Sequence, residues 1–129
     1  MTDIEKNLIK IDLCCRLPYN VKVHAKYTDL GETIEVDGIV KMIDDDGVVG
    51  IEVINDFSSA WTYVQIDNVK PYLFPLSSMT MEQAQQWHKY ANDRGGLAPS
   101  TDWLNAHHFD YRGLIPKGLA IDATGLGIY

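Results

Sequence analysis

The spacing of the apolar residues changes twice along this chain, and this change limits the folds that the chain can adopt. Between residues 21 and 73 apolar and polar residues alternate, which is the pattern of half-buried β-strands. Within residues 1–19 and beyond residue 80, apolar residues instead recur at helical spacing. The sequence therefore predicts an α+β fold in which a β part lies between helical segments.

Turn signals divide the β part into short strands. The segment 44–47 (Asp-Asp-Asp-Gly) is the strongest of them, because Asp-Gly suits a tight hairpin. A loop is expected over residues 55–59, and Gly38 inside a strand predicts a bulge or a sharp bend. Four or five short antiparallel strands predict a small SH3-like β-barrel over about residues 20–75, because closure removes exposed sheet edges.

Two helices are predicted after the barrel. Thr80 and Gln83 have the spacing of a capping box, and the Gly95–Gly96 pair ends the helix that follows. A second, shorter helix is predicted to begin within residues 99–102.

The helical part, residues 80–129, includes a C-terminal tail in which the weak alternation of residues 119–123 could add a strand. Both helices are expected to pack on the barrel around one shared core, so that residues 1–129 form a single domain.

Charge and cysteine content narrow the function classes. The formal net charge is −7, from 18 acidic and 11 basic residues, and an acidic surface repels nucleic-acid phosphates and anionic lipid. No apolar run approaches the roughly 20 residues of a membrane span, and no secretory signal pattern begins the chain. Cys14 and Cys15 are adjacent, so they cannot cross-link distant segments, and we expect them to be buried. A cytoplasmic protein that binds neither membrane nor nucleic acid is expected.

Three segments carry a resemblance to known sequences: residues 16–23 (RLPYNVKV), 70–80 (KPYLFPLSSMT) and 102–115 (DWLNAHHFDYRGLI). Together they resemble a group of small uncharacterised proteins encoded by gut bacteria and their phages, over most of the chain from about residue 11. The resemblance implies frequent occurrence in prophage or mobile-element regions. It implies no activity and no catalytic residue.

A dense group of metal-ligating residue types lies at His107, His108 and Asp110. Adjacent residues on a helix point about 100° apart, so the two histidines are poorly placed to hold one ion together. Only His24 or His88 could add a further imidazole. We therefore expect no metal, no cofactor and no enzyme, although a small metal-dependent enzyme centred on these three residues is one alternative. A nucleic-acid-associated barrel is the other.

The segment 103–112 concentrates aromatic and charged residues, and a helix this short must dock on the rest of the domain. Because only one side of it can face the core, we expect Trp103 and Leu104 to point inward, while His108 and Phe109 stay partly accessible. The predicted binding surface consists of Trp103, His107, His108, Phe109, Asp110, Tyr111 and Arg112. The favoured interpretation is a non-enzymatic interaction or accessory module of a phage or mobile element, with a protein or peptide partner. The oligomeric state stays open.

Overall fold

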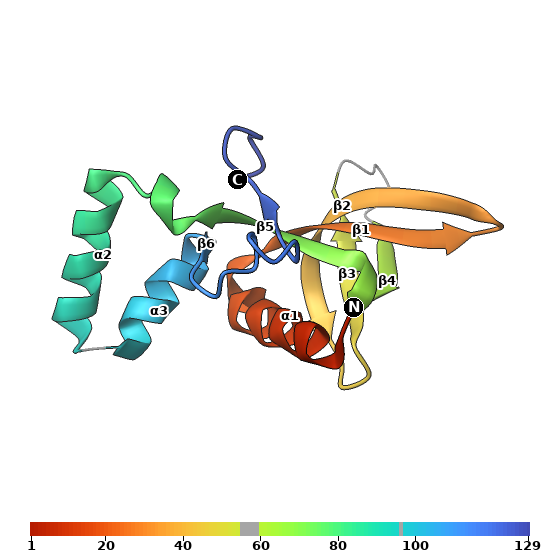
Figure 1. Cartoon of the computed structure of the whole chain (residues 1–129), viewed down its shortest axis with the longest axis horizontal. Coiled ribbons are helices and arrows are strands. Elements are labelled where there is room, and N and C mark those ends of the chain that lie inside the picture. Colours follow the sequence, from red (N-terminus) through yellow and green to blue (C-terminus); the bar gives the residue numbers. More distant parts are fainter. Residues whose placement is uncertain (55–59, 96) are drawn as a thin grey trace.

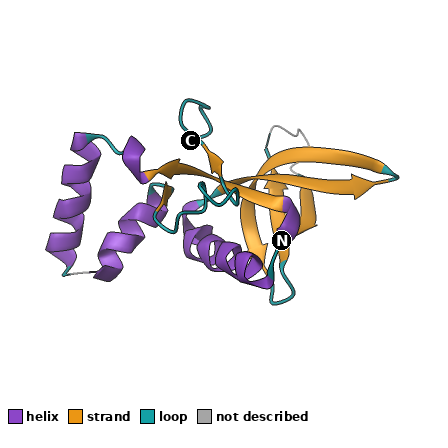
Figure 2. Ribbon diagram, in the orientation of Figure 1, coloured by secondary structure: helices purple, strands orange, loops and turns teal. Residues whose placement is uncertain are grey.

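The computed structural model describes residues 1–54, 60–95 and 97–129, so the loop predicted over 55–59 and the predicted role of Gly96 lie outside the described residues. Figures 1 and 2 show helices at one end of an elongated molecule and a long β-hairpin at the other. The elements, with η marking 3₁₀ helices, are α1 (Asp3–Arg16), η1 (Leu17–Tyr19), β1 (Lys22–Asp29), β2 (Glu32–Ile43), β3 (Val48–Val53), β4 (Trp61–Gln65), η2 (Ile66–Asn68), β5 (Val69–Pro75), η3 (Leu76–Ser78), α2 (Met81–Arg94), α3 (Leu97–Ala106), β6 (Phe109–Asp110) and β7 (Ile121–Asp122).

The predicted N-terminal helix is confirmed as α1, which begins with a capping box. The backbone N–H of Glu5 donates to the Thr2 hydroxyl at 3.1 Å, and the Thr2 N–H donates to the Glu5 carboxylate at 3.0 Å. One side of the helix buries Ile9 and Leu13 completely, in the same core cluster as the apolar residues of the sheet. α1 therefore forms a layer against the sheet (Figure 1).

The strands form one mixed, open sheet, and the predicted closure into a barrel is wrong. The strand order is β4-β3-β2-β1-β5-β6, and β7 also pairs with β5. Neighbouring strands in the series β4-β3-β2-β1-β5 are antiparallel. β6 and β7 each run parallel to β5. η2 connects β4 to β5, and the two strands do not pair. Ile9 and Leu13 of α1 cover the apolar face instead, so the core is closed by a helix rather than by strand pairing.

The β2 strand continues through Gly38, and its bulge lies further along, between Val40 and Met42. Glycine at this position is explained by a close approach rather than by the predicted bend. A Cβ atom at Gly38 would overlap the Cγ2 of Ile51 and lie 2.7 Å from the carbonyl oxygen of Glu52. The residue therefore permits the tight contact between β2 and β3.

The turn predicted over 44–47 is confirmed, and the Asp44 carboxylate stabilises it. The Asp44 Oδ1 accepts hydrogen bonds from the backbone N–H groups of Asp46 and Val48, both at 2.9 Å. Gly47 adopts φ +81°, which a side chain would strain. β1 and β2 form the longer hairpin that projects beyond the rest of the sheet in Figure 1.

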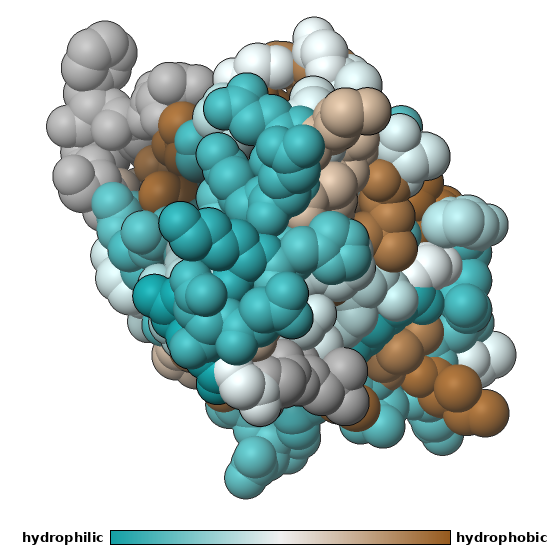
Figure 3. Space-filling view, turned by 90° about the vertical axis from the view of Figure 1, so that its left-hand side faces the viewer, coloured by the Kyte–Doolittle hydropathy of each residue, from teal (hydrophilic) through white to brown (hydrophobic). Residues whose placement is uncertain are grey.

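α2 packs on α3 rather than on the sheet, so the predicted packing on the β part is wrong for α2, whereas α3 contacts β6. The capping box at Thr80 and Gln83 is confirmed, and Gly95 ends α2 at φ +80°. The indole N–H of Trp87 on α2 donates to the carbonyl oxygen of Ser100 on α3 at 3.1 Å. The opposite side of α2 faces solvent, and Figure 3 shows a largely hydrophilic surface on this side of the molecule.

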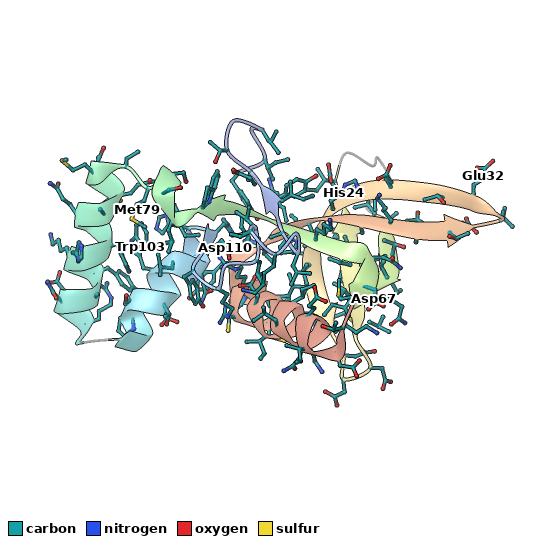
Figure 4. All side chains as sticks on the ribbon, viewed as in Figure 1. His24, Glu32, Asp67, Met79, Trp103 and Asp110 are labelled. Atoms are coloured by element: carbon teal, nitrogen blue, oxygen red, sulfur yellow. The ribbon has the colours of Figure 1, made fainter. Side chains whose placement is uncertain are left out.

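The buried apolar residues form two clusters, so the expected single shared core is also wrong. The larger cluster lies between α1 and the sheet. The smaller one consists of Trp103, Leu104 and Phe109, with partly buried neighbours that include Met79. Figure 4 shows Met79 and Trp103 in the space beside α2 and α3. The larger cluster therefore packs α1 against the sheet, and the smaller one packs α2 and α3 against the ends of β5 and β6.

The α3 helix ends at Ala106, four residues before Asp110. The prediction that the helix extends through the segment 103–112 is therefore wrong, and Asp110 lies on β6. His108 adopts φ +62° and so interrupts the helical backbone. The Phe74 N–H donates to the His108 carbonyl oxygen at 2.8 Å, which begins the parallel pairing of β5 with β6. The strand that residues 119–123 could add is confirmed as β7.

Two smaller observations concern the helices. Cys14 is exposed and Cys15 is partly exposed, because they lie on the side of α1 that does not face the sheet; the prediction that both are buried is wrong.

Among the described residues, no helix is long and apolar enough to cross a lipid bilayer.

Candidate functional site

A cavity of about 450 Å³ opens where η3, the start of α2, the end of α3 and the segment 123–129 meet. Its volume and its mixture of aromatic and polar walls make it the candidate site. The lining residues are Phe74, Ser78, Thr80, Gln83, Ala106, His107, His108, Phe109, Thr124, Gly125 and Tyr129.

Three aromatic rings form a connected apolar wall of this cavity. The ring centroid of Phe74 lies 6.1 Å from that of Phe109 and 5.8 Å from that of Tyr129. Phe109 is 2% exposed, because β6 holds it beside β5 in the smaller core cluster. Packing from behind therefore fixes the rings before any ligand arrives, which lowers the entropic cost of binding.

Tyr129 is held in place by backbone contacts. Its hydroxyl donates to the carbonyl oxygen of Tyr72 at 2.8 Å and accepts from the backbone N–H of Lys22 at 2.9 Å. The Lys22 ammonium donates to the carbonyl oxygen of Ile128 at 2.5 Å. Burial raises the pKa of the Tyr129 hydroxyl, which stays neutral and keeps both contacts at physiological pH.

The two histidines of the site differ in environment. His108 is 8% exposed and its ring stacks on Tyr129 at 3.8 Å; burial, with the nearby positive charge of Arg16, lowers its pKa to about 4. Its Nδ1 has no hydrogen-bond partner among the described residues. His107 is exposed and stacks on Trp103 at 4.0 Å, and partial burial lowers its pKa as well. Both imidazoles are therefore neutral at pH 7.

The rim of the cavity carries neutral polar groups. Ser78, Thr80, Gln83 and Thr124 supply hydroxyl and amide groups, and among the described residues no Asp, Glu, Lys or Arg lines the cavity. The Ser78 hydroxyl donates to the carbonyl oxygen of Pro75 at 2.7 Å, while the Thr80 and Gln83 side chains form the cap of α2. The site is thus suited to an uncharged, mainly apolar group that meets polar atoms only at the opening.

Three of the seven residues predicted to form a binding surface line this cavity: His107, His108 and Phe109. Trp103 and Leu104 are buried, as predicted. The predicted accessibility of His108 and Phe109 is wrong, because parallel pairing of β6 with β5 turns this segment inward. The segment contributes one wall of the site rather than an exposed face.

Asp110 lies outside the cavity and stabilises the loop that follows β6. Its two carboxylate oxygens accept the backbone N–H groups of Leu114 and Ile115, each at 2.9 Å. Asp110 is buried between α3 and the sheet (Figure 4). Both oxygens are therefore already used by the fold.

Tyr111 and Arg112 belong to a partly buried polar network that reaches α1. The Arg112 Nη1 donates to the Asp12 carboxylate at 2.8 Å, and the other oxygen of that carboxylate accepts from the Arg16 Nε at 2.9 Å. The Tyr111 hydroxyl donates to the side-chain oxygen of Asn105 at 2.9 Å. Tyr111 and Arg112 therefore connect the segment after β6 to α3 and α1, respectively.

The geometry gives no support to a metal centre at His107, His108 and Asp110. The Asp110 carboxylate is committed to backbone groups, and His107 is held against Trp103. Across residues 1–54, 60–95 and 97–129, no three or more His, Cys, Asp or Glu side chains are placed to hold a metal ion.

Sequence reasoning missed Phe74, Thr124 and Tyr129 as site residues. They lie on β5 and in the segment 123–129, far from the histidines in sequence. The parallel pairing of β5 with β6 and β7, together with the hydrogen bonds of Tyr129, brings these segments together. No local pattern encodes such a pairing, although the weak alternation near residue 121 indicated that the tail joins the sheet.

Comparison with known proteins adds no relative: the chain matches no protein-family model, no curated protein and no solved structure. The geometry of the cavity and the charge of the surface therefore carry the functional interpretation.

Proposed function

We propose that the protein is a non-enzymatic interaction module and that its cavity receives an apolar or aromatic side chain of a protein partner. The observation that carries this proposal is the fixed wall of Phe74, Phe109 and Tyr129 inside an open cavity with a neutral rim. Apolar side chains inserted into preformed pockets are the usual energetic anchors of protein interfaces.

A protein partner fits the charge of the molecule better than a nucleic acid does. The chain carries a net charge of −7, and no lysine or arginine in the described part of the chain lines the cavity. Nucleic-acid affinity depends on cations that neutralise phosphates, so this site offers little of that energy. A partner that presents a neutral apolar side chain pays no comparable electrostatic cost.

Two further points support the setting that we propose for this interaction. The resemblance of residues 16–23, 70–80 and 102–115 to proteins of gut bacteria and their phages supports an accessory role in a mobile genetic element. Cys14 and Cys15 are free thiols, which supports a reducing, cytoplasmic compartment.

The test uses capped amino acids as the smallest mimics of an inserted side chain. N-acetyl amides of phenylalanine, tryptophan and leucine are titrated into the ¹⁵N-labelled protein. Amide resonances of His107, Thr124 and Gly125 should shift at millimolar concentrations, while the N-acetyl amide of glutamate should leave them unchanged.

Thr124→Trp tests whether the cavity itself is the binding site. Thr124 is an exposed lining residue, so an indole there fills the cavity without replacing a core side chain. This variant should lose the shifts, while Thr28→Trp, at an exposed position on β1, should keep them. Shifts that persist in Thr124→Trp, or that do not map to the cavity in the wild type, would contradict the proposal.

A further inference from the structure

We propose that the free edge of β4 binds an extended basic peptide, which adds a strand to the sheet. This surface is separate from the cavity at Phe74 and Phe109, so the inference does not depend on the proposed function of that cavity. β4 is the first strand of the sheet order, and in the described part of the chain no strand pairs with its outer side (Figure 1).

The hydrogen-bond phase of β4 shows which backbone groups are available. The Ile66 N–H donates to the Gly47 carbonyl oxygen, and the Val53 N–H donates to the Ala60 carbonyl oxygen, each at 2.9 Å. In this antiparallel register, the even-numbered residues of β4 turn their N–H and C=O groups toward β3.

The odd-numbered residues of β4, Trp61, Tyr63 and Gln65, consequently turn their N–H and C=O groups toward the free edge. Such a row of donors and acceptors is the template that an added strand requires.

The side chains along this edge do not protect it from pairing. Natural sheet edges carry lysine, proline or bulges that prevent added strands, whereas β4 reads Trp-Thr-Tyr-Val-Gln. Trp61 is 50% exposed and Tyr63 is 61% exposed. Both rings lie on the same side of the strand, where they can pack against alternate side chains of an incoming peptide.

The charge at one end of β4 indicates the chemistry of the occupant. Gln65 also lines a second cavity, of about 240 Å³, between the first turns of α1 and the turn at 44–47. The charged residues of its lining are Asp3, Lys6, Lys10, Asp45, Asp46 and Asp67.

Only part of this negative charge is neutralised by the protein. The Lys6 ammonium lies 3.3 Å from the Asp67 carboxylate, and Figure 4 shows Asp67 near the start of β5. The Lys10 ammonium donates to the backbone carbonyl oxygen of Asp45. Among the described residues, the carboxylates of Asp45 and Asp46 make no ion pair. A basic peptide that pairs with β4 can therefore place a lysine or arginine near the Asp45 and Asp46 carboxylates at the Gln65 end of the strand.

A basic peptide also fits the edge better than a second copy of this chain. Pairing of β4 with β4 would bring together two molecules with a net charge of −7 each. The negative charge of this protein instead attracts a basic peptide, which raises the association rate and stabilises the complex.

The experiment uses a capped heptapeptide, Lys-Val-Thr-Val-Lys-Val-Lys, and an acidic counterpart with glutamate in place of each lysine. Titration of the ¹⁵N-labelled protein with the basic peptide should shift the amides of Trp61, Tyr63 and Gln65 and slow their hydrogen exchange. The acidic peptide should not bind, and high salt should weaken the basic one.

Two sets of variants separate the edge from the charge. Tyr63→Pro removes an outward N–H without removing a bond to β3, and it should abolish binding; Tyr63→Thr keeps the N–H and should retain weaker binding. Asp45→Asn with Asp46→Asn leaves Asp44 to stabilise the turn and should raise the Kd by roughly three- to tenfold.

Three results would overturn the inference. They are equal binding of the acidic peptide, basic-peptide shifts that map away from β4, and a dimer of the free protein that Tyr63→Pro dissociates. The asparagine variant tests the charge argument even if the proline variant fails to fold.

Discussion

The Nη2 of Arg16 lies 2.6 Å from the carbonyl oxygen of Phe109 and donates a hydrogen bond to it. The two residues lie on α1 and β6, at opposite ends of the sequence, so this contact joins the helix under the sheet to the wall of the cavity. Arg16 and its partner Asp12 have no solvent-exposed surface. The position of the cavity wall thus depends on a buried charge on α1.

Replacing Arg16 with methionine should strongly destabilise the fold. The variant leaves the Phe109 carbonyl oxygen without its donor and Asp12 with Arg112 as its remaining partner. Removal of one member of a buried ion pair costs about 3 kcal/mol or more in the free energy of unfolding, measured by urea denaturation. Arg94→Met, which changes an exposed arginine on α2, should cost about 1 kcal/mol or less. Equal losses in the two variants would show that the buried network does not stabilise the fold.

Acid should destabilise the protein through His108. Its pKa is 6.5 when unperturbed and about 4 in the fold, so the unfolded chain binds this proton more tightly. The contribution of His108 is fully present above pH 6.5 and is lost as the pH falls toward 4, a change of up to roughly 3 kcal/mol. His108→Asn has no such titration and tolerates the positive φ, so its stability should fall less over this window. Identical pH slopes in urea denaturation would contradict the assignment.

His24 should stabilise the fold at low pH, opposite to the effect of His108. Burial alone would lower its pKa, but hydrogen bonds to Asp37 at 2.8 Å and Glu35 at 3.1 Å outweigh burial and raise it. Charged His24 therefore stabilises the fold below pH 6.5, and this contribution is lost as the pH rises through the raised pKa. Asp37→Asn should lower the His24 pKa in an NMR titration. Glu32→Gln, at the distant end of the hairpin in Figure 4, should leave it unchanged.

The sequence predicts those parts of the fold that depend on local chemistry. The capping box at Thr80, the turn at 44–47 and the alternation of the strands each have a local cause, and each forms as that cause requires. Gly38 does not form the predicted bend and instead allows a close approach of Ile51. Such a contact between two strands leaves no pattern in the residues around Gly38, so the sequence could not predict it.

The errors concern contacts between segments that are distant in sequence. Closure of the sheet was expected because edges are unfavourable, but the burial of Ile9 and Leu13 from α1 removes the need for closure. The cavity was missed for a related reason. It depends on parallel pairing of two-residue strands with β5, and such short strands have no periodicity to detect.

Phe109→Ala tests directly whether this segment is a wall of the cavity or an exposed face. An exposed phenylalanine could be truncated at little cost, whereas Phe109 is 2% exposed and lies between Phe74 and Trp103, with ring centroids at 6.1 and 5.9 Å. Removal of a buried aromatic ring loses its transfer free energy and leaves a cavity, at a cost of about 3–5 kcal/mol. Trp61→Ala is the matched control, because that ring is half exposed at the sheet edge and its loss should cost about 1 kcal/mol or less. A Phe109→Ala variant as stable as Trp61→Ala would mean that β6 does not hold this ring inside the fold.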